Sequence, residues 1–196
     1  MFHAPIDTRF GNASPFGRFA GLGDTPLQFP AAMDLCRDQV AATGDCDGVR
    51  FAAAARKSTS GQAFRPAFAV GDWRVFTSFC VARRVPAGQR VVIPGRSDRT
   101  IRFVVEGTLW QESASQRSGA VLPAGTILGE DALFCDGAGD LDVRTLEDTL
   151  ILELSLPRQK ELTASCPEIG FELLRAAGAV IAARGRAPET RAALAN

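Results

Sequence analysis

The sequence predicts a mainly β protein, in which an antiparallel jelly-roll barrel has flanking helices and is followed by a long C-terminal helix. Between residues 81 and 156, short apolar runs alternate with glycine-containing turns, as expected for many short antiparallel strands. After residue 157 the apolar residues recur at the period of a helix. The chain has 196 residues, 46% of them hydrophobic, which is enough for one substantial core. We expect an extended arm, an N-terminal helical segment, the barrel, the C-terminal helices and a tail at residues 1–30, 31–80, 81–156, 157–186 and 187–196.

The segment before the barrel carries weaker signals. Residues 1–30 are rich in Gly, Pro and Phe and have neither a helical nor a strand period, which predicts an extended arm. A short helix is expected from Pro30 to Thr43, and the following stretch GDCDGVR is expected to break it. Asp72 can cap a second short helix, whose core-facing residues would be Trp73, Phe76 and Cys80.

The barrel segment shows its clearest hairpin between Thr100 and Trp110. Ile101, Phe103 and Val105 alternate with their neighbours, and Gly107 then turns the chain. Alternate side chains of a strand point to opposite faces, so these three residues are expected to face the core.

Two helices are predicted after the barrel, from Pro157 to Ser165 and from Pro167 to Arg184. The longer helix has two adjacent apolar stripes. We expect one to pack on the barrel and the other to stay exposed and pair two subunits, because small residues allow close helix approach. The pairing stripe would be Leu173, Ala177 and Val180, and the neighbouring stripe Leu174, Gly178 and Ile181. Packing of the first stripe in the core of its own subunit is the alternative.

The composition argues against several classes of function. Basic and acidic residues both number 22, so no overall charge attracts nucleic acid or an anionic membrane. The five cysteines are scattered without a C-x-x-C pair, and the single histidine is His3, so neither a metal site nor a His-dependent catalytic set is expected. No apolar run approaches the roughly 20 residues of a membrane span, and no secretion signal opens the chain. A cytoplasmic protein without enzymatic activity or cofactor is expected.

The order of the glycines and the stretch LGED, followed by VRTLEDTLILEL and a helix, resemble the cyclic nucleotide-binding domain of CRP/FNR-type regulators and of kinase regulatory subunits. The resemblance covers about residues 81–186. The glycines that match in order are Gly88, Gly95, Gly107, Gly125 and Gly129.

The resemblance implies an anion-binding segment at residues 128–148, which we call the cassette. In that family, backbone N–H groups after a Gly-Glu pair face the cyclic phosphate, the glutamate binds the ribose hydroxyl, and an arginine neutralises the phosphate. Gly129 and Glu130 match the Gly-Glu pair. The arginine and the residue after it fall at Gly139 and Asp140 in one alignment, or at Asp140 and Leu141 in the other, and neither supplies an arginine. The cassette is therefore expected to be degenerate.

The charge along the cassette supports the same expectation. Between residues 130 and 148 stand seven acidic side chains and one basic side chain, Arg144. We expect Leu141, Val143 and Thr145 to point into the barrel. Side chains alternate between the two faces of a strand, so Arg144 is expected to point outward. A phosphate would meet repulsion, so we expect this pocket to bind neither cAMP nor cGMP.

A basic segment lies upstream of the cassette. Between residues 81 and 102 six arginines stand against a single acidic residue, Asp98. They are expected either to be solvated on strand faces and turns or to form a basic patch for an acidic or nucleotide-like partner. These arginines are Arg83, Arg84, Arg90, Arg96, Arg99 and Arg102.

Two functions remain open. The first is a non-enzymatic regulatory or adaptor module that binds a protein partner and forms a homodimer through its C-terminal helix. The alternative is an effector-sensing CRP/FNR-type transcription regulator that lacks its own DNA-binding module. Only RAPETRAALAN follows Gly185, whereas a helix-turn-helix module takes roughly 60 residues, so direct DNA binding is not expected.

Overall fold

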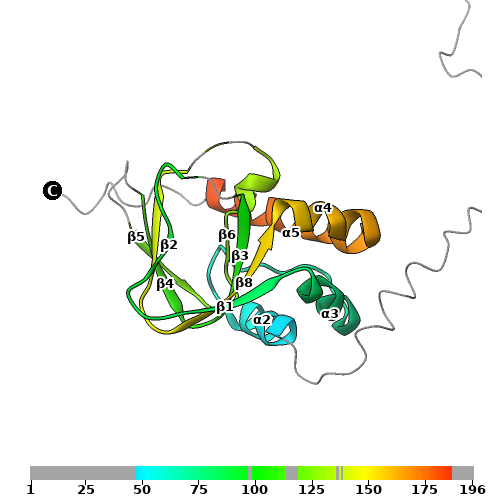
Figure 1. Cartoon of the computed structure of the whole chain (residues 1–196), viewed down its shortest axis with the longest axis horizontal. Helices are drawn as coiled ribbons and strands as arrows, with labels where there is room; N and C mark the ends of the chain where they lie inside the picture. Colours follow the sequence, from blue (N-terminus) through cyan, green and yellow to red (C-terminus); the bar gives the residue numbers. More distant parts are fainter. Residues whose placement is uncertain (1–46, 97–98, 114–118, 136, 138, 187–196) are drawn as a thin grey trace, which may run out of the picture. The chain divides into compact units, whose positions relative to one another are not determined.

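The computed structural model describes residues 47–96, 99–113, 119–135, 137 and 139–186 (Figure 1). The predicted arm at 1–30, the helix expected over Pro30–Thr43 and the tail at 187–196 lie outside these residues. The elements in chain order are α2 (Asp47–Lys57), α3 (Val70–Ser78), β1 (Val81–Val85), β2 (Arg90–Val92), β3 (Thr100–Glu106), β4 (Thr108–Ser113), β5 (Gly119–Pro123), β6 (Ile127–Leu128), the 3-10 helix η1 (Glu130–Leu133), β7 (Leu141–Thr145), β8 (Thr149–Ser155), α4 (Leu156–Ser165) and α5 (Pro167–Arg186).

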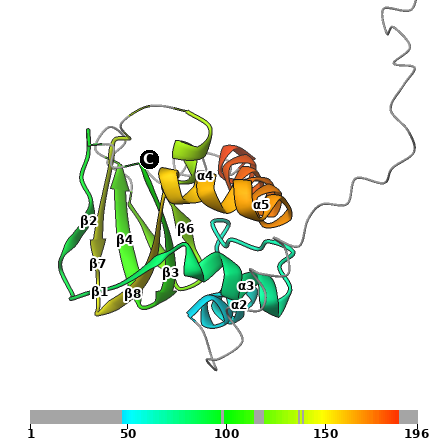
Figure 2. The ribbon, with the colours of Figure 1, turned by 45° about the vertical axis from the view of Figure 1, so that its right-hand side comes forward.

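The strands form two four-stranded antiparallel sheets, with strand orders β1-β8-β3-β6 and β2-β7-β4-β5. The first strand pairs with the last, the second with the seventh, the third with the sixth and the fourth with the fifth. This nested pairing is the connectivity of a jelly roll. The two sheets, the flanking helices and the long C-terminal helix confirm the predicted fold class (Figures 1 and 2).

The central strand β3 is buried on both faces because helices cover one side of its sheet and the second sheet covers the other. Ile101, Phe103 and Val105 belong to the core that includes residues of α2, α3, α4 and α5. Val104 points the opposite way and packs with Leu109 and others between the sheets. The alternation predicted for β3 is confirmed, and it separates the protein into two apolar layers.

Helix α2 was not predicted. It begins at Asp47, inside the stretch that was expected to break a helix. Gly48 lies in its first turn, where a Cβ would come within 2.6 Å of Thr77 Cγ2, so its glycine allows α2 to approach α3 closely. The four consecutive alanines of α2 have the highest helix propensity of any residue and were the signal for this helix.

Helix α3 begins close to where it was predicted. The Asp72 carboxylate accepts a hydrogen bond from the Ala69 backbone N–H at 2.8 Å, and so satisfies a free donor at the start of the helix. Trp73 and Phe76 lie in the core, as predicted, and the rings of Phe76 and Phe103 are 5.1 Å apart in an edge-to-face arrangement.

The two C-terminal helices, α4 and α5, follow the predicted bounds closely, but α5 turns the other face to the barrel. The pairing stripe predicted from the sequence is buried, with Leu173 and Ala177 at 0% exposure and Val180 at 3%. On the opposite side, Phe171 is 64% exposed, and on the flank of the buried stripe Ile181 is 36% exposed. The predicted exposure of the Leu173 stripe is therefore wrong, and the alternative, packing in the core of its own subunit, holds.

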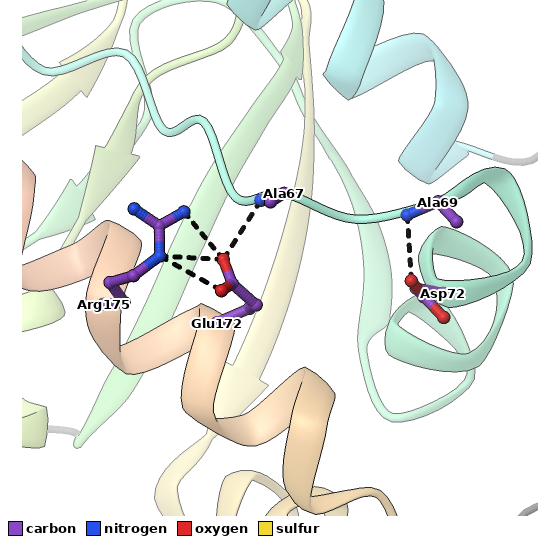
Figure 3. A network of polar contacts seen from close by, with 5 residues as sticks. All are labelled: Ala67, Ala69, Asp72, Glu172 and Arg175. Carbon is purple, nitrogen blue, oxygen red and sulfur yellow. Dashed lines mark hydrogen bonds and ion pairs between the residues drawn. The ribbon is translucent and has the colours of Figure 1, made fainter.

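The segment that connects α2 to α3 is attached to α5 by polar contacts (Figure 3). The backbone N–H of Ala67 donates to Glu172 Oε2 at 3.2 Å, and Arg175 donates to the same carboxylate at 2.7 and 2.9 Å. Arg175 and Ala67 together hold the pKa of Glu172 below its usual range.

None of the helices in the described part of the chain is long and apolar enough to cross a membrane.

Candidate functional site

A cavity of about 220 Å³ lies at the cassette, between η1, β7, the segment that joins β2 to β3, and the end of α5. We call it the cassette cavity. Apolar side chains of both sheets and of α5 line part of it: Val92, Leu128, Leu141, Val143 and Ile181. Charged side chains line the rest: Arg96, Arg99, Arg102, Arg184 and Asp131.

Gly129 sets the course of the chain at the cavity. It has a φ of 73° and precedes η1, and its carbonyl accepts a hydrogen bond from Ala132 N–H at 3.2 Å. A Cβ at this position would lie 2.6 Å from the carbonyl oxygen of Thr100, so both the backbone angle and the space require glycine. The five glycines that matched in the sequence all have positive φ: Gly88, Gly95, Gly107, Gly125 and Gly129.

Glu130 is turned away from the cavity. Its side chain is fully buried and forms an ion pair with Arg184, near the end of α5. The same guanidinium donates to Gln62 Oε1 at 3.1 Å and to the Ile127 carbonyl at 3.3 Å. Burial raises the pKa of the Glu130 carboxyl, and the charge of Arg184 opposes that shift. The carboxylate that the resemblance assigns to a ribose hydroxyl is therefore engaged inside the protein.

The positions where the resemblance places the phosphate arginine hold no cation. Gly139 and Leu141 line the cassette cavity, and the carbonyl of Gly139 accepts a hydrogen bond from Gly95 N–H at 2.9 Å. The Asp140 carboxylate accepts a hydrogen bond from Ser113 Oγ at 2.7 Å. Of the five cassette residues singled out in the sequence, the structure brings Gly129, Gly139 and Leu141 together at the cavity.

The six arginines upstream of the cassette divide into two groups. Arg96, Arg99 and Arg102 line the cassette cavity. The others lie on β1 and β2 and form ion pairs there. Arg83 pairs with Glu153 at 3.5 Å, Arg84 with Glu106 at 3.9 Å and Arg90 with Asp142 at 2.9 Å. The segment is therefore not one basic surface, and its second half belongs to the same site as the cassette.

Arg184 also lines the cavity, and it is not among the site residues predicted from the sequence. It continues the stripe of Leu173, Ala177 and Val180 by one more helical turn, and an arginine at the end of a buried apolar stripe was the available signal. A side chain in that position must reach either water or a buried acid.

The acidic residues of the cassette do not gather at the cavity. The Asp142 carboxylate forms ion pairs with the guanidinium groups of Arg90, at 2.9 Å, and Arg144, at 3.0 Å. Both arginines lower the pKa of Asp142, and Arg144 has the larger effect. Asp148 accepts a hydrogen bond from the backbone of Ala87 at 3.0 Å. Arg144 faces outward, as predicted. Among the described residues, Asp131 is the one acidic side chain that lines the cavity. The acidic charge summed along the segment is thus not concentrated at the cavity.

No protein-family model matches the sequence, and no curated protein matches it at a significant level. Similar solved structures include the catabolite activator protein of Thermus thermophilus, 22% identical with a TM-score of 0.53 over 61% of this chain and 56% of that chain. A cyclic nucleotide-binding domain from Methylobacillus flagellatus is 16% identical, with a TM-score of 0.59 over 71% of this chain and 78% of that domain. The N-terminal domain of a transcriptional regulator from Streptomyces coelicolor is 19% identical, with a TM-score of 0.52 over 65% and 93%. The chain spans little more than half the length of the Thermus protein, 56%.

Proposed function

We propose that this chain, which has the cyclic nucleotide-binding-like fold, is a cytoplasmic, non-enzymatic regulatory or adaptor module. It acts through protein contacts and binds neither cAMP nor cGMP through its cassette. The observation that carries this proposal is the ion pair between the buried carboxylate of Glu130 and the half-buried Arg184.

To bind a ribose hydroxyl, the Glu130 carboxylate would have to leave its ion pair with Arg184. Breaking a buried ion pair on one side costs about 3–5 kcal/mol, because a charge is left without its partner in a poorly solvated place. The phosphate contact is also missing, since Gly139 and Asp140 provide no cation where the resemblance places the arginine. Loss of both contacts removes the two interactions that distinguish a cyclic nucleotide from other ligands.

The protein contact that we propose is the exposed face of α5, with a second copy of this chain as partner. Its apolar residues follow one another at intervals of three, four and three, which is the spacing of a helix-pairing seam. They are Phe171, Leu174, Gly178 and Ile181. A Cβ at Gly178 would meet nothing within 4 Å, so the backbone of α5 is open to close approach there. This seam replaces the Leu173 stripe, which is buried.

The experiment that tests the proposed function is a calorimetric titration of the purified chain with cAMP and with cGMP. We expect dissociation constants weaker than about 100 µM for both nucleotides. Micromolar binding of either nucleotide would overturn the proposal.

One observation favours a second function, an effector-sensing CRP/FNR-type regulator that works together with a DNA-binding relative. The cassette cavity has several arginines in its lining, although none comes from the cassette itself. A site of that kind suits an effector other than a cyclic nucleotide. Discovery of a ligand for the cavity would favour this function over a purely adaptor role.

A further inference from the structure

We propose that a cavity between α2 and the segment that follows it binds an acidic peptide of a partner protein, with an aromatic side chain of the peptide inside. We call it the α2 cavity. It measures about 250 Å³ and shares no lining residue with the cassette cavity. The proposed function pairs α5 with a second copy and names no other partner, so this inference goes beyond it. The lining residues come from α2, the following segment and α3: Ala52, Ala55, Arg56, Phe64, Arg65, Pro66, Phe68 and Trp73.

The alanines of α2 leave the space that forms the cavity. Ala52 and Ala55 are three residues apart, so they lie on one face of the helix, and both line the cavity. Each carries only a methyl group, whereas the other apolar wall is built from the rings of Phe64, Phe68 and Trp73. A cavity of about 150 Å³ is enough for a benzene ring. The α2 cavity, at about 250 Å³, therefore has room for one aromatic side chain.

The segment that forms this aromatic wall is held in place on both sides of the cavity. The Phe64 N–H donates to the Gly125 carbonyl at 3.0 Å, between β5 and β6. The Ala67 N–H donates to Glu172 Oε2 at 3.2 Å, on α5 (Figure 3). A site whose walls are already ordered loses little conformational freedom when a ligand binds.

The rings of the wall favour an aromatic anchor over an aliphatic one. Phe64 and Trp73 form the floor, at 0% and 4% exposure, and Phe68 is half-buried at the rim. The rings of Phe68 and Trp73 are 4.9 Å apart in an edge-to-face arrangement. A further ring can make the same kind of contact with them, because the edge of one ring is attracted to the face of another.

Two exposed arginines at the rim favour acidic residues beside the anchor. Arg65 donates to the carbonyls of Ala55, at 3.0 Å, and Ser58, at 2.5 Å, so its hydrogen bonds are to neutral groups. Arg56 forms neither a hydrogen bond nor an ion pair with any residue that the structure describes. The described part of the chain also places no acidic side chain in the lining. The positive charge at the rim is therefore available to carboxylates of a partner.

The acids near Phe68 belong to a different cavity. Phe68 also lines a cavity of about 130 Å³, whose acidic residues are Asp72, Glu168 and Glu172. Asp72 accepts a hydrogen bond at the start of α3, and Glu172 is paired with Arg175 (Figure 3). These carboxylates do not line the α2 cavity, so the charge at its rim stays positive.

A fluorescent synthetic peptide with one phenylalanine between two runs of glutamate tests this inference on the full chain. One control peptide has serine in place of phenylalanine, and another has lysine in place of every glutamate. Fluorescence anisotropy measures all three. We expect the first peptide to bind with a dissociation constant below about 100 µM, and both controls to bind at least about tenfold more weakly.

The two tryptophans of the chain show where the peptide binds. Trp73 lines the α2 cavity, and Trp110 lies on β4 in the other sheet, 36% exposed. Their indole N–H groups give separate signals in a proton–nitrogen correlation spectrum, and Trp110→Phe assigns them. We expect the Trp73 signal to shift saturably with the unlabelled peptide and the Trp110 signal to stay in place.

Two matched charge reversals test the rim. Arg56→Glu reverses a charge in the lining, and Lys160→Glu makes the same change in net charge at an exposed residue of α4. We expect Arg56→Glu to weaken the acidic peptide at least about fivefold and Lys160→Glu to leave its affinity unchanged, with wild-type circular dichroism in both.

Any of four results would overturn the inference: the acidic peptide does not bind below about 100 µM, the serine peptide binds equally well, the Trp73 signal does not move, or Arg56→Glu binds as tightly as wild type. A second copy, or another part of the chain, seated in the cavity would keep the peptide out and give the first result. The proposed function is read in the separate titration with cyclic nucleotides, so the two conclusions can fail independently.

Discussion

Glu130 of η1 and Arg184 of α5 form an ion pair whose carboxylate has no exposed surface. The pair connects the cassette to the last turns of the C-terminal helix. Through its contacts with Gln62 and Ile127, the same arginine also reaches the segment after α2 and strand β6. The Arg184 guanidinium therefore links α5 to η1, to the segment after α2 and to β6.

Replacing Arg184 with alanine is expected to destabilise the protein by about 3–5 kcal/mol, because Glu130 would remain buried without a counter-charge. Urea denaturation measures the loss. Arg175→Ala is the matched control, since Arg175 forms an exposed pair with Glu172 on the same helix and should change stability little. Equal, small effects of both variants would show that the Glu130 pair does not hold α5 in place.

The stability of the protein should depend on pH through Glu130. Its pKa is raised above its ordinary value of 4.5, chiefly because burial penalises the charged form. The folded state then holds the proton more tightly than the unfolded chain. This stabilisation is fully present below pH 4.5 and is lost as the pH rises through the raised pKa.

Glu130→Gln should remove that part of the pH dependence, and Glu168→Gln, at an exposed acid of α5, should keep it. Urea midpoints measured between about pH 4 and pH 8 check the difference. If the Glu130 variant keeps the wild-type slope, another group is responsible for it.

Ala177→Glu should abolish the folded state, because Ala177 is completely buried in α5 and a carboxylate there has neither space nor a partner. A loss of more than about 3 kcal/mol is expected. Ala179→Glu makes the same change on the exposed side of the helix and should leave a folded protein. Soluble, folded Ala177→Glu monomer would place Ala177 at an interface between subunits instead.

Phe171→Lys should shift the protein from dimer to monomer without unfolding it, because it places like charges across the proposed α5 seam. Leu146→Lys, at another exposed apolar side chain, is the control and should not change the assembly. Sedimentation velocity at about 100 µM protein measures both. A wild-type chain that sediments as a monomer at this concentration would exclude the pairing.

Gly139→Arg combined with Asp140→Ser should raise the affinity for cAMP, because it places a cation at the position where the resemblance expects the phosphate arginine. A side chain at Gly139 would start in open space, with no atom within 4 Å of its Cβ. An added charge-assisted contact should improve binding at least about tenfold. Calorimetry with the double variant and with Asp140→Ser alone separates the arginine from the loss of the acid. No gain in the double variant would count against the alignment of the cassette.

The elements with local signals could be predicted from the sequence alone. Alternating apolar residues predicted strand β3, and glycines at the turns predicted positions where the backbone requires a positive φ. The helical period predicted α4 and α5 to within two residues. These features depend on a few neighbouring residues, and side-chain alternation and backbone sterics act over that same range. Helix α2 was not predicted because the glycines and aspartates of GDCDGVR disfavour a helix, although four alanines follow them.

The choice of the buried stripe of α5, and the arginines that come together at the cavity, depend on packing between distant parts of the chain. The stripes of Leu173 and Leu174 are similar in hydrophobicity, so the choice between them depends on the surface that the barrel presents. Arg99 and Arg184 are far apart in the chain and line one cavity, whereas the acids near Arg144 turn elsewhere. Charge acts through distance in space, and a sum along the sequence contains no such distance.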